Sequence, residues 1–127
     1  MCKILIVEDN ASFRQSLKNI LHLKFPSIVI EEAADGNETL QKVDAVRPEL
    51  IFMDIQLPGR DGLQLTREIK ASYPNRKVII LTSHDLPEFR EAAVLCGATR
   101  FITKDSLIWE EIETLIKPIS SELHKNS

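Results

Sequence analysis

The sequence has little of what several large classes of protein require. Its two cysteines, Cys2 and Cys96, have no CxxC spacing, so we expect two buried thiols in a reducing compartment rather than a disulfide framework. No apolar run approaches the roughly 18–20 residues of a membrane span, and no signal-peptide pattern opens the chain. Neither GxGxxG nor a GxxxxGK phosphate loop occurs, which argues against nucleotide binding. These absences predict a cytoplasmic protein with no membrane partner.

An excess of basic residues is also missing. The chain carries 16 lysines and arginines against 19 aspartates and glutamates, for a net charge of −3. Proteins that bind DNA or RNA through phosphate contacts need clustered positive charge. We therefore expect no nucleic-acid binding through this chain itself, whose 127 residues suit one globular domain.

Five short runs rich in β-branched and aliphatic residues recur along the chain and predict strands. The apolar residues of several runs stand together rather than alternating, as in strands that are covered on both faces. The runs are residues 3–7, 28–32, 50–54, 77–82 and 99–103. Amphipathic stretches of helical length separate them, so strand and helix alternate five times. This alternation predicts an α/β fold with a doubly wound, five-stranded parallel sheet.

The end of the chain allows two interpretations. Pro118 lacks an N–H and clashes with the carbonyl four residues earlier, which favours the end of the last helix and a frayed tail. Apolar residues after Pro118 nevertheless stay in phase with Ile112 and Ile116, so a kinked continuation stays open. We expect a domain over residues 1–117 and a C-terminal tail, or the start of a linker, over residues 118–127.

Polar side chains gather where the predicted strands end. The first strand is followed by Glu8 and Asp9, the third ends at Asp54, the fourth ends at Thr82, and Lys104 follows the fifth. In an open parallel sheet, ligands bind beyond the carboxyl ends of the strands. We therefore expect these five side chains to converge on one pocket.

Three carboxylates in one pocket would repel one another, so either their pKa values rise or a cation binds. Oxygen ligands at an open site suit Mg²⁺, which keeps several waters and takes one or two carboxylates together with phosphate oxygens. With the ammonium of Lys104 and the hydroxyl of Thr82, such a site would trap a phosphoryl group. Asp54 is the best nucleophile, because carboxylates can form aspartyl phosphates and an accessible turn follows it.

Five motifs follow one another along the chain: Ile4-Leu5-Ile6-Val7-Glu8-Asp9; Met53-Asp54; Leu57-Pro58-Gly59 with Asp61-Gly62; Leu81-Thr82-Ser83; and Gly97-Ala98 leading to Phe101 and Lys104. Their order and spacing resemble the receiver domain of two-component response regulators, over about residues 2–117. The resemblance implies a flavodoxin-like (βα)5 fold with strand order 2-1-3-4-5.

The resemblance also implies a phosphorylated switch. Asp54 would accept a phosphoryl group from a phosphohistidine of a sensor histidine kinase or of a histidine phosphotransfer protein. Asp9, Asp54 and the backbone carbonyl of Gln56 would bind Mg²⁺, with Glu8 acting through water. The domain would catalyse only its own phosphorylation and autodephosphorylation and would not be a metabolic enzyme.

Further residues would carry the signal outward. By the same resemblance, Thr82 and Phe101 form a switch pair, and Lys104 holds the phosphoryl oxygens. Phosphorylation would shift the surface made by the fourth helix, the fifth strand and the fifth helix. That surface would control an output or partner, such as transcription, and would offer a contact for a homodimer.

The sequence departs from the family pattern at two positions. Asp105 follows Lys104, where the family often has proline after a cis bond, and a cis bond before a non-proline residue costs about 3 kcal/mol. We therefore predict a trans bond between Lys104 and Asp105. This Lys-Asp pair resembles receivers that precede helix-turn-helix DNA-binding domains. Phe101 replaces the commoner tyrosine and has no hydroxyl to donate.

Two other functions stay open. A magnesium-dependent phosphatase with an aspartyl nucleophile would have a second aspartate two residues after it, where this chain has Gln56. Sustained turnover of a phosphate ester would support that function. A phosphorylation-independent interaction module would be supported if Mg²⁺ and a phosphoryl mimic left the spectra unchanged.

Overall fold

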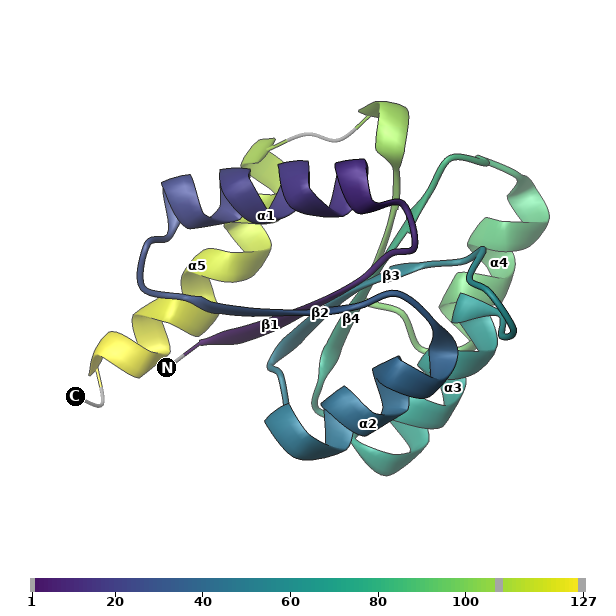
Figure 1. The fold of residues 1–127 in the computed structure, drawn as a ribbon, viewed down its shortest axis with the longest axis horizontal. Helices are drawn as coiled ribbons and strands as arrows, with labels where there is room; N and C mark the ends of the chain where they lie inside the picture. Colours follow the sequence, from purple (N-terminus) through teal and green to yellow (C-terminus); the bar gives the residue numbers. More distant parts are fainter. Residues whose placement is uncertain (1, 107–108, 126–127) are drawn as a thin grey trace.

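The computed structural model describes residues 2–106 and 109–125, in which strands and helices alternate along the chain (Figure 1). The strands are β1 (Lys3–Val7), β2 (Val29–Ala33), β3 (Leu50–Asp54), β4 (Lys77–Thr82) and β5 (Arg100–Thr103). The helices are α1 (Ala11–Lys24), α2 (Gly36–Val46), α3 (Gly62–Ser72), α4 (Pro87–Leu95) and α5 (Trp109–Lys125), with a 3-10 turn, η1 (Lys104–Ser106), before α5.

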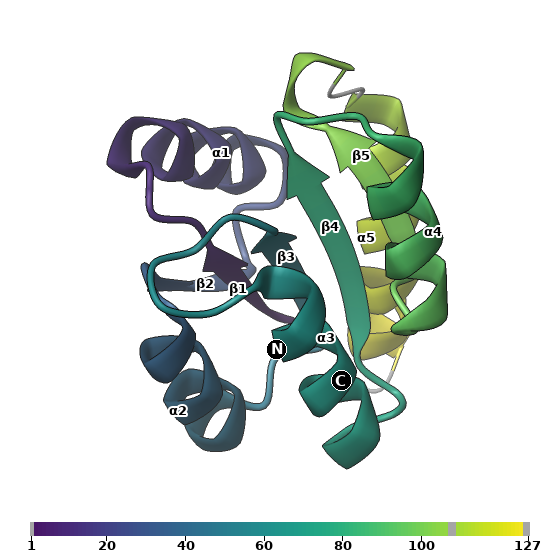
Figure 2. The same ribbon diagram turned by 90° about the vertical axis from the view of Figure 1, so that its right-hand side faces the viewer.

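The five strands form one parallel sheet in the order β2-β1-β3-β4-β5. Helices α1 and α5 cover one face of the sheet, and α2, α3 and α4 cover the other (Figures 1 and 2). This is the doubly wound, flavodoxin-like architecture that the sequence predicts. Within the described ranges, no helix combines the length and apolar character needed to cross a membrane.

Burial on both faces explains the apolar runs of the central strands. In β1, Ile4 and Ile6 pack into the core beneath α1 and α5, whereas Leu5 and Val7 pack into the core beneath α2, α3 and α4. All five residues of β3 are buried. Each large aliphatic side chain buried in this way contributes roughly 1.5–3 kcal/mol. The two cores thus hold β3, and the carboxylate at its end, in a fixed place.

Short polar side chains start the helices that leave the carboxyl edge of the sheet. Asn10 caps α1 by accepting a hydrogen bond from the backbone N–H of Phe13 (3.1 Å). The Asp35 side chain caps α2 by accepting from the backbone N–H of Glu38 (2.9 Å), and the Asp61 side chain caps α3 by accepting from the N–H of Leu63. Because each cap satisfies a free helix N–H, the loops at this edge turn at defined residues.

The expected strand boundaries agree with the structure at the centre of the sheet and differ by one residue at its edges. Strand β2 covers residues 29–33 rather than 28–32, because the N–H of Ile28 closes a turn onto the carbonyl of Phe25 (3.2 Å). Strand β5 begins at Arg100 rather than at Thr99. The bond between Lys104 and Asp105 is trans, as predicted.

The expected frayed tail after Pro118 was wrong, because α5 runs from Trp109 to Lys125 with Pro118 inside it. Proline removes one N–H donor from the helix ladder. The helix already buries Ile112 and Ile116 against the sheet before that point, and the sequence keeps the same apolar phase beyond it. Periodicity therefore outweighs the single lost hydrogen bond.

A close backbone approach at Gly62 fixes the loop between β3 and α3. A Cβ atom at this residue would lie 1.9 Å from the carbonyl oxygen of Asp54. The N–H of Gly62 also donates to the carbonyl of Ile55 (2.8 Å). The start of α3 is thus pressed against the end of β3, with no space for a side chain between them.

We predict that Gly62→Ala lowers the free energy of unfolding by about 2 kcal/mol or more, because the added methyl group must displace backbone. Gly36→Ala is the matched control, since Gly36 also follows a capping aspartate, and the three atoms nearest to its Cβ would all belong to the side chain of Arg60. We expect that control to lose less free energy of unfolding than Gly62→Ala, because the Arg60 side chain moves at lower cost than the backbone of Asp54. Urea unfolding followed by circular dichroism measures both, and equal losses would contradict the account.

Candidate functional site

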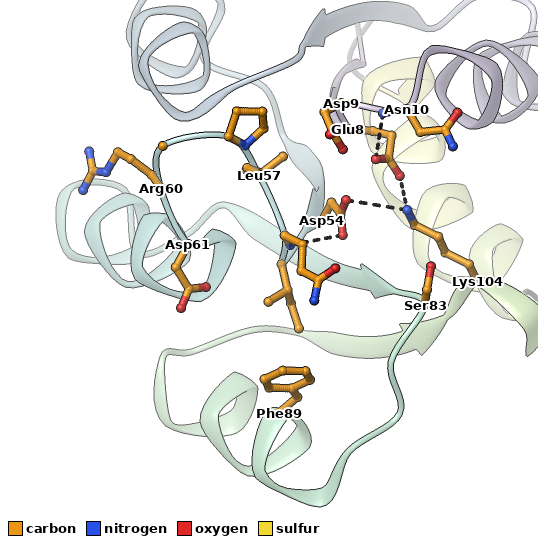
Figure 3. A pocket seen from close by; sticks show the side chains of 14 residues that line it. Glu8, Asp9, Asn10, Asp54, Leu57, Arg60, Asp61, Ser83, Phe89 and Lys104 are labelled. Atoms are coloured by element: carbon orange, nitrogen blue, oxygen red, sulfur yellow. Dashed lines mark hydrogen bonds and ion pairs between the residues drawn. The ribbon is translucent and has the colours of Figure 1, made fainter.

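A hollow of about 910 Å³ opens at the carboxyl edge of the sheet, above the ends of β1 and β3 (Figure 3). The loops after β1, β3, β4 and β5 supply its walls. The residues that line it are Glu8, Asp9, Asn10, Asp54, Ile55, Gln56, Leu57, Pro58, Gly59, Arg60, Asp61, Ser83, Phe89 and Lys104.

Three carboxylates meet in this hollow. Glu8, Asp9 and Asp54 each offer an oxygen atom, and these atoms all lie within 4.8 Å of one another. Glu8 and Asp54 are buried, with 2% and 6% of their surface exposed, whereas Asp9 is exposed. The cluster is therefore buried at Glu8 and Asp54 and open to solvent at Asp9.

One lysine faces the two buried carboxylates. The Nζ atom of Lys104 forms an ion pair with Oε1 of Glu8 and lies 3.6 Å from Oδ2 of Asp54 (Figure 3). The same atom lies 4.7 Å from the centre of the Phe13 ring. Only 15% of the lysine side chain is exposed. A single ammonium thus bridges two acids at the end of the sheet.

Backbone and guanidinium donors complete the site. The N–H of Asn10 donates to Oε2 of Glu8 (3.1 Å), and the N–H of Gln56 donates to Oδ1 of Asp54 (3.4 Å). Arg14 donates from Nη1 to the carbonyl oxygen of Glu8 (2.5 Å). The two backbone N–H groups orient the carboxylates, and Arg14 holds the backbone of Glu8.

The pKa values of the two buried acids, Glu8 and Asp54, shift in opposite directions. Burial and the neighbouring Glu8 carboxylate raise the pKa of Asp54 to about 7. Burial also disfavours the ionised form of Glu8, but its hydrogen bonds with Lys104, Asp54 and Asn10 outweigh burial and hold its pKa below the ordinary value. Ionisation is therefore unfavourable at Asp54 and favourable at Glu8.

The donor set fits a small, hard cation. Mg²⁺ binds oxygen ligands at 2.0–2.1 Å in an octahedron, so its ligand atoms lie about 3–4 Å apart. The three carboxylate oxygens all lie within 4.8 Å of one another, and the exposed position of Asp9 leaves room for water. A divalent cation would also neutralise the charge that raises the pKa of Asp54.

A family model described as the response regulator receiver domain matches residues 4–117. The chain belongs to this family. It is therefore a receiver domain of two-component signalling, a class of signalling modules rather than of metabolic enzymes.

Individual relatives agree with this assignment. The receiver domain is 37% identical over 105 residues to the oxygen regulatory protein NreC of Staphylococcus epidermidis, covering 82% of this chain and 48% of that protein. The chain thus spans about half the length of the curated relatives it matches.

Solved structures are similar as well. The signal receiver domain of a DNA-binding response regulator from Colwellia psychrerythraea superposes with a TM-score of 0.89 at 26% identity, over 95% of this chain and 99% of that one. A DNA-binding response regulator of the LuxR family from Staphylococcus aureus gives a TM-score of 0.83 at 28% identity, over 92% and 98% of the two chains.

The structure brings together most of the residues that the sequence singled out. Glu8, Asp9, Asp54, Gln56 and Lys104 all line the hollow of the receiver domain. They stand at or just after the ends of β1, β3 and β5, and their common position follows from the parallel arrangement of these strands.

The expected switch pair lies outside the lining. Thr82 is buried at the end of β4, where its Oγ1 accepts a hydrogen bond from the N–H of His84 (3.1 Å). Phe101 is half-buried on β5, and its ring centre lies 4.7 Å from the guanidinium carbon of Arg90. Asp85 holds that guanidinium through two hydrogen bonds (2.5 and 3.0 Å).

Sequence reasoning missed several residues of the site. Phe13 and Arg14 stand in the first turn of α1, where the apolar pattern marks Phe13 only as a core residue. Ser83 and Phe89 line the hollow from the β4 side. Ser83 was recognised only within the motif Leu81-Thr82-Ser83, and its place just after the expected strand end was a further signal for the hollow.

We predict that Asp54→Asn stabilises the metal-free receiver domain at about pH 8, by on the order of 2 kcal/mol, because it removes a buried charge. The folded pKa of Asp54, about 7, exceeds its ordinary value of 3.8, so the folded protein binds more protons between those two values. The wild type must therefore lose stability as the pH rises through this window.

Urea unfolding in a chelating buffer checks this prediction. We expect the advantage of Asp54→Asn to shrink steadily as the pH falls from about 8 to about 5. An advantage that does not change with pH would contradict the assigned charge of Asp54.

Proposed function

We propose that this receiver domain is a phosphorylation switch in which Asp54 accepts a phosphoryl group from a phosphohistidine. The donor would be a sensor histidine kinase or a histidine phosphotransfer protein. The observation that carries the proposal is the contact of one lysine with two buried carboxylates beside a third, exposed one. The lysine, together with a cation that the carboxylates would hold, suits the site to a group that brings both negative charge and acceptor oxygens.

In the transfer step, one carboxylate oxygen of Asp54 attacks phosphorus in line with the leaving nitrogen. The new bond joins that oxygen to phosphorus, while the phosphorus–nitrogen bond breaks and leaves its electron pair on the donor imidazole. The Asp54 carboxylate must be ionised to attack. Lys104, whose Nζ already lies 3.6 Å from Asp54, donates hydrogen bonds to the phosphoryl oxygens as they arrive.

Asp9, Asp54 and the backbone carbonyl of Gln56 would hold Mg²⁺, with Glu8 contributing through water. Bound there, the cation supplies charge neutralisation for the carboxylates and for the equatorial phosphoryl oxygens. Asp9 is exposed, so a cation arriving from solvent can reach its carboxylate directly. Glu8 is buried and already paired with Lys104, which suits an indirect contact through water.

Thr82 and Phe101 would pass the change to the surface. The Thr82 hydroxyl would turn toward the phosphoryl oxygens and give up the hydrogen bond it accepts from His84. The space it leaves would admit the Phe101 ring, which would leave its contact with Arg90. The surface of α4, β5 and α5 would then favour its active form, since phosphate binds that form more tightly.

The outputs of this surface would be a partner domain or a second copy of the chain. Val94 and Leu95 of α4 are 76% and 75% exposed, which suits a homodimer contact. Residues 1–117 would form the receiver unit, and residues 118–127 would lead into a linker. Transcription is the proposed output, because matched relatives are named as transcriptional regulators.

The domain itself would bind no nucleic acid, because its net charge is −3. Its two free cysteines are buried, which suits the reducing cytoplasm where we expect it to act. Its catalysis would be limited to its own phosphorylation and autodephosphorylation. Gln56 stands where an aspartyl phosphatase would need a second aspartate, which disfavours turnover of external phosphate esters.

We predict that acetyl phosphate with Mg²⁺ labels the wild-type chain, and that Asp54→Asn slows labelling at least about 100-fold by removing the nucleophile. Chelation of Mg²⁺ should abolish the labelling of the wild type. Phosphate-affinity electrophoresis of samples taken over time measures the rates.

Asp61→Asn is the matched control, because Asp61 lines the same hollow but serves as the cap of α3, a role that asparagine also fills. We expect it to be labelled within about twofold of the wild-type rate. Equal labelling of Asp54→Asn and the wild type would exclude Asp54 as the acceptor.

A further inference from the structure

The Lys104 ammonium has an aromatic neighbour that is not part of the acidic cluster. Its Nζ atom lies 4.7 Å from the centre of the Phe13 ring, within the range of a cation–π contact. The same Nζ atom is paired with Glu8 and approaches Asp54. Two acids and one ring face therefore surround the ammonium, on a side chain that is 15% exposed.

The position of Phe13 is fixed from two directions. Its backbone N–H donates to the capping oxygen of Asn10, so the residue lies in the first turn of α1. Its half-buried ring packs against the core formed by α1, α5 and the sheet. The Phe13 ring is thus held in a fixed position, whereas the Lys104 side chain that it contacts has a flexible four-carbon stem.

On the α1 side, the Phe13 ring is the group in contact with the Lys104 ammonium among the described contacts. A lysine ammonium is strongly hydrated and gains rotamer freedom when it turns toward water. Glu8 alone can hold the ammonium but draws it away from Asp54, since the ion pair with Glu8 is the closer of the two. A ring face attracts the ammonium without neutralising it, so the charge stays available to a phosphoryl group.

We propose that Phe13 is a positioning residue for phosphoryl transfer: its ring face holds the Lys104 ammonium beside Asp54, where the incoming phosphoryl oxygens need it. This inference rests on the proposed function of Asp54 and assigns a role to a residue outside the acidic cluster. Phe13 itself does not touch the reacting atoms.

Conservative substitutions at Phe13 separate the ring face from the apolar packing. Phe13→Leu keeps an apolar side chain of similar size but has no aromatic face, whereas Phe13→Tyr keeps that face. At saturating Mg²⁺, we expect Phe13→Leu to be labelled by acetyl phosphate about 3–10-fold more slowly than the wild type, and Phe13→Tyr within about twofold.

Phe25→Leu is the matched control, because Phe25 packs against the same core at the other end of α1 and does not line the hollow. We expect it to react at the wild-type rate. Phe13→Leu reacting as fast as Phe25→Leu would overturn the proposal, and so would Phe13→Tyr reacting as slowly as Phe13→Leu.

Fluorination gives a graded version of the test. Replacing Phe13 by phenylalanines with one, two and three ring fluorines weakens the negative ring face stepwise and scarcely changes its size. The logarithm of the labelling rate should fall with each fluorine. A rate that stays constant across the series would show that only packing matters at this position.

The contact can also be measured without any phosphoryl transfer. In NMR spectra of the metal-free protein, the ring current of Phe13 should move the ε-methylene protons of Lys104 upfield, and Phe13→Leu should abolish that shift. Unshifted protons in the wild type would overturn the inference. If the shift is present but the wild type takes up no phosphoryl group, the proposed function fails instead.

Discussion

The repulsion between two buried carboxylates and the single ammonium that relieves it are central to this molecule. Glu8 follows β1 and Asp54 ends the neighbouring strand β3, so the parallel sheet places both buried side chains at the same edge. Burial and the neighbouring Glu8 carboxylate raise the pKa of Asp54 to about 7, and Lys104, which pairs with Glu8 and lies further from Asp54, offsets only part of this rise. A ligand that brings positive charge close to Asp54 is therefore favoured there.

The rest of the fold keeps this unfavourable cluster in place. Strand β3 is buried along its whole length, so the backbone of Asp54 is held in place next to Glu8. The close approach of Gly62 presses the following helix against the same residue, and Asn10 fixes the start of the helix on the other side of the site. The free energy of two apolar cores thus maintains a local arrangement that is unfavourable by itself.

Sequence reasoning succeeded where burial leaves a clear pattern. The central strands β1, β3 and β4 are covered on both faces, and their apolar runs predicted both of their ends correctly. The edge strands β2 and β5 are half-buried, so their pattern is weaker and the predicted bounds differ by one residue. The prediction for the last helix was wrong because the helix-breaking tendency of Pro118 was given more weight than the helical spacing of the apolar residues on both sides of it.

The same distinction holds for the candidate site. The carboxyl ends of parallel strands meet by necessity, so Glu8, Asp9, Asp54 and Lys104 were predicted to converge without knowledge of any side-chain rotamer. The contact between Lys104 and Phe13 was not predictable in this way. It depends on how α1 is rotated about its axis, and the sequence pattern specifies only that Phe13 faces the core.

The most direct test of the central claim is to locate the phosphoryl group itself. Borohydride reduces an acyl phosphate to an alcohol, so a phosphorylated aspartate becomes homoserine, which peptide mass spectrometry identifies. After treatment with acetyl phosphate and Mg²⁺, the account predicts homoserine at Asp54 and unchanged residues at Glu8 and Asp9. Reduction at either of those two residues, with Asp54 intact, would contradict it.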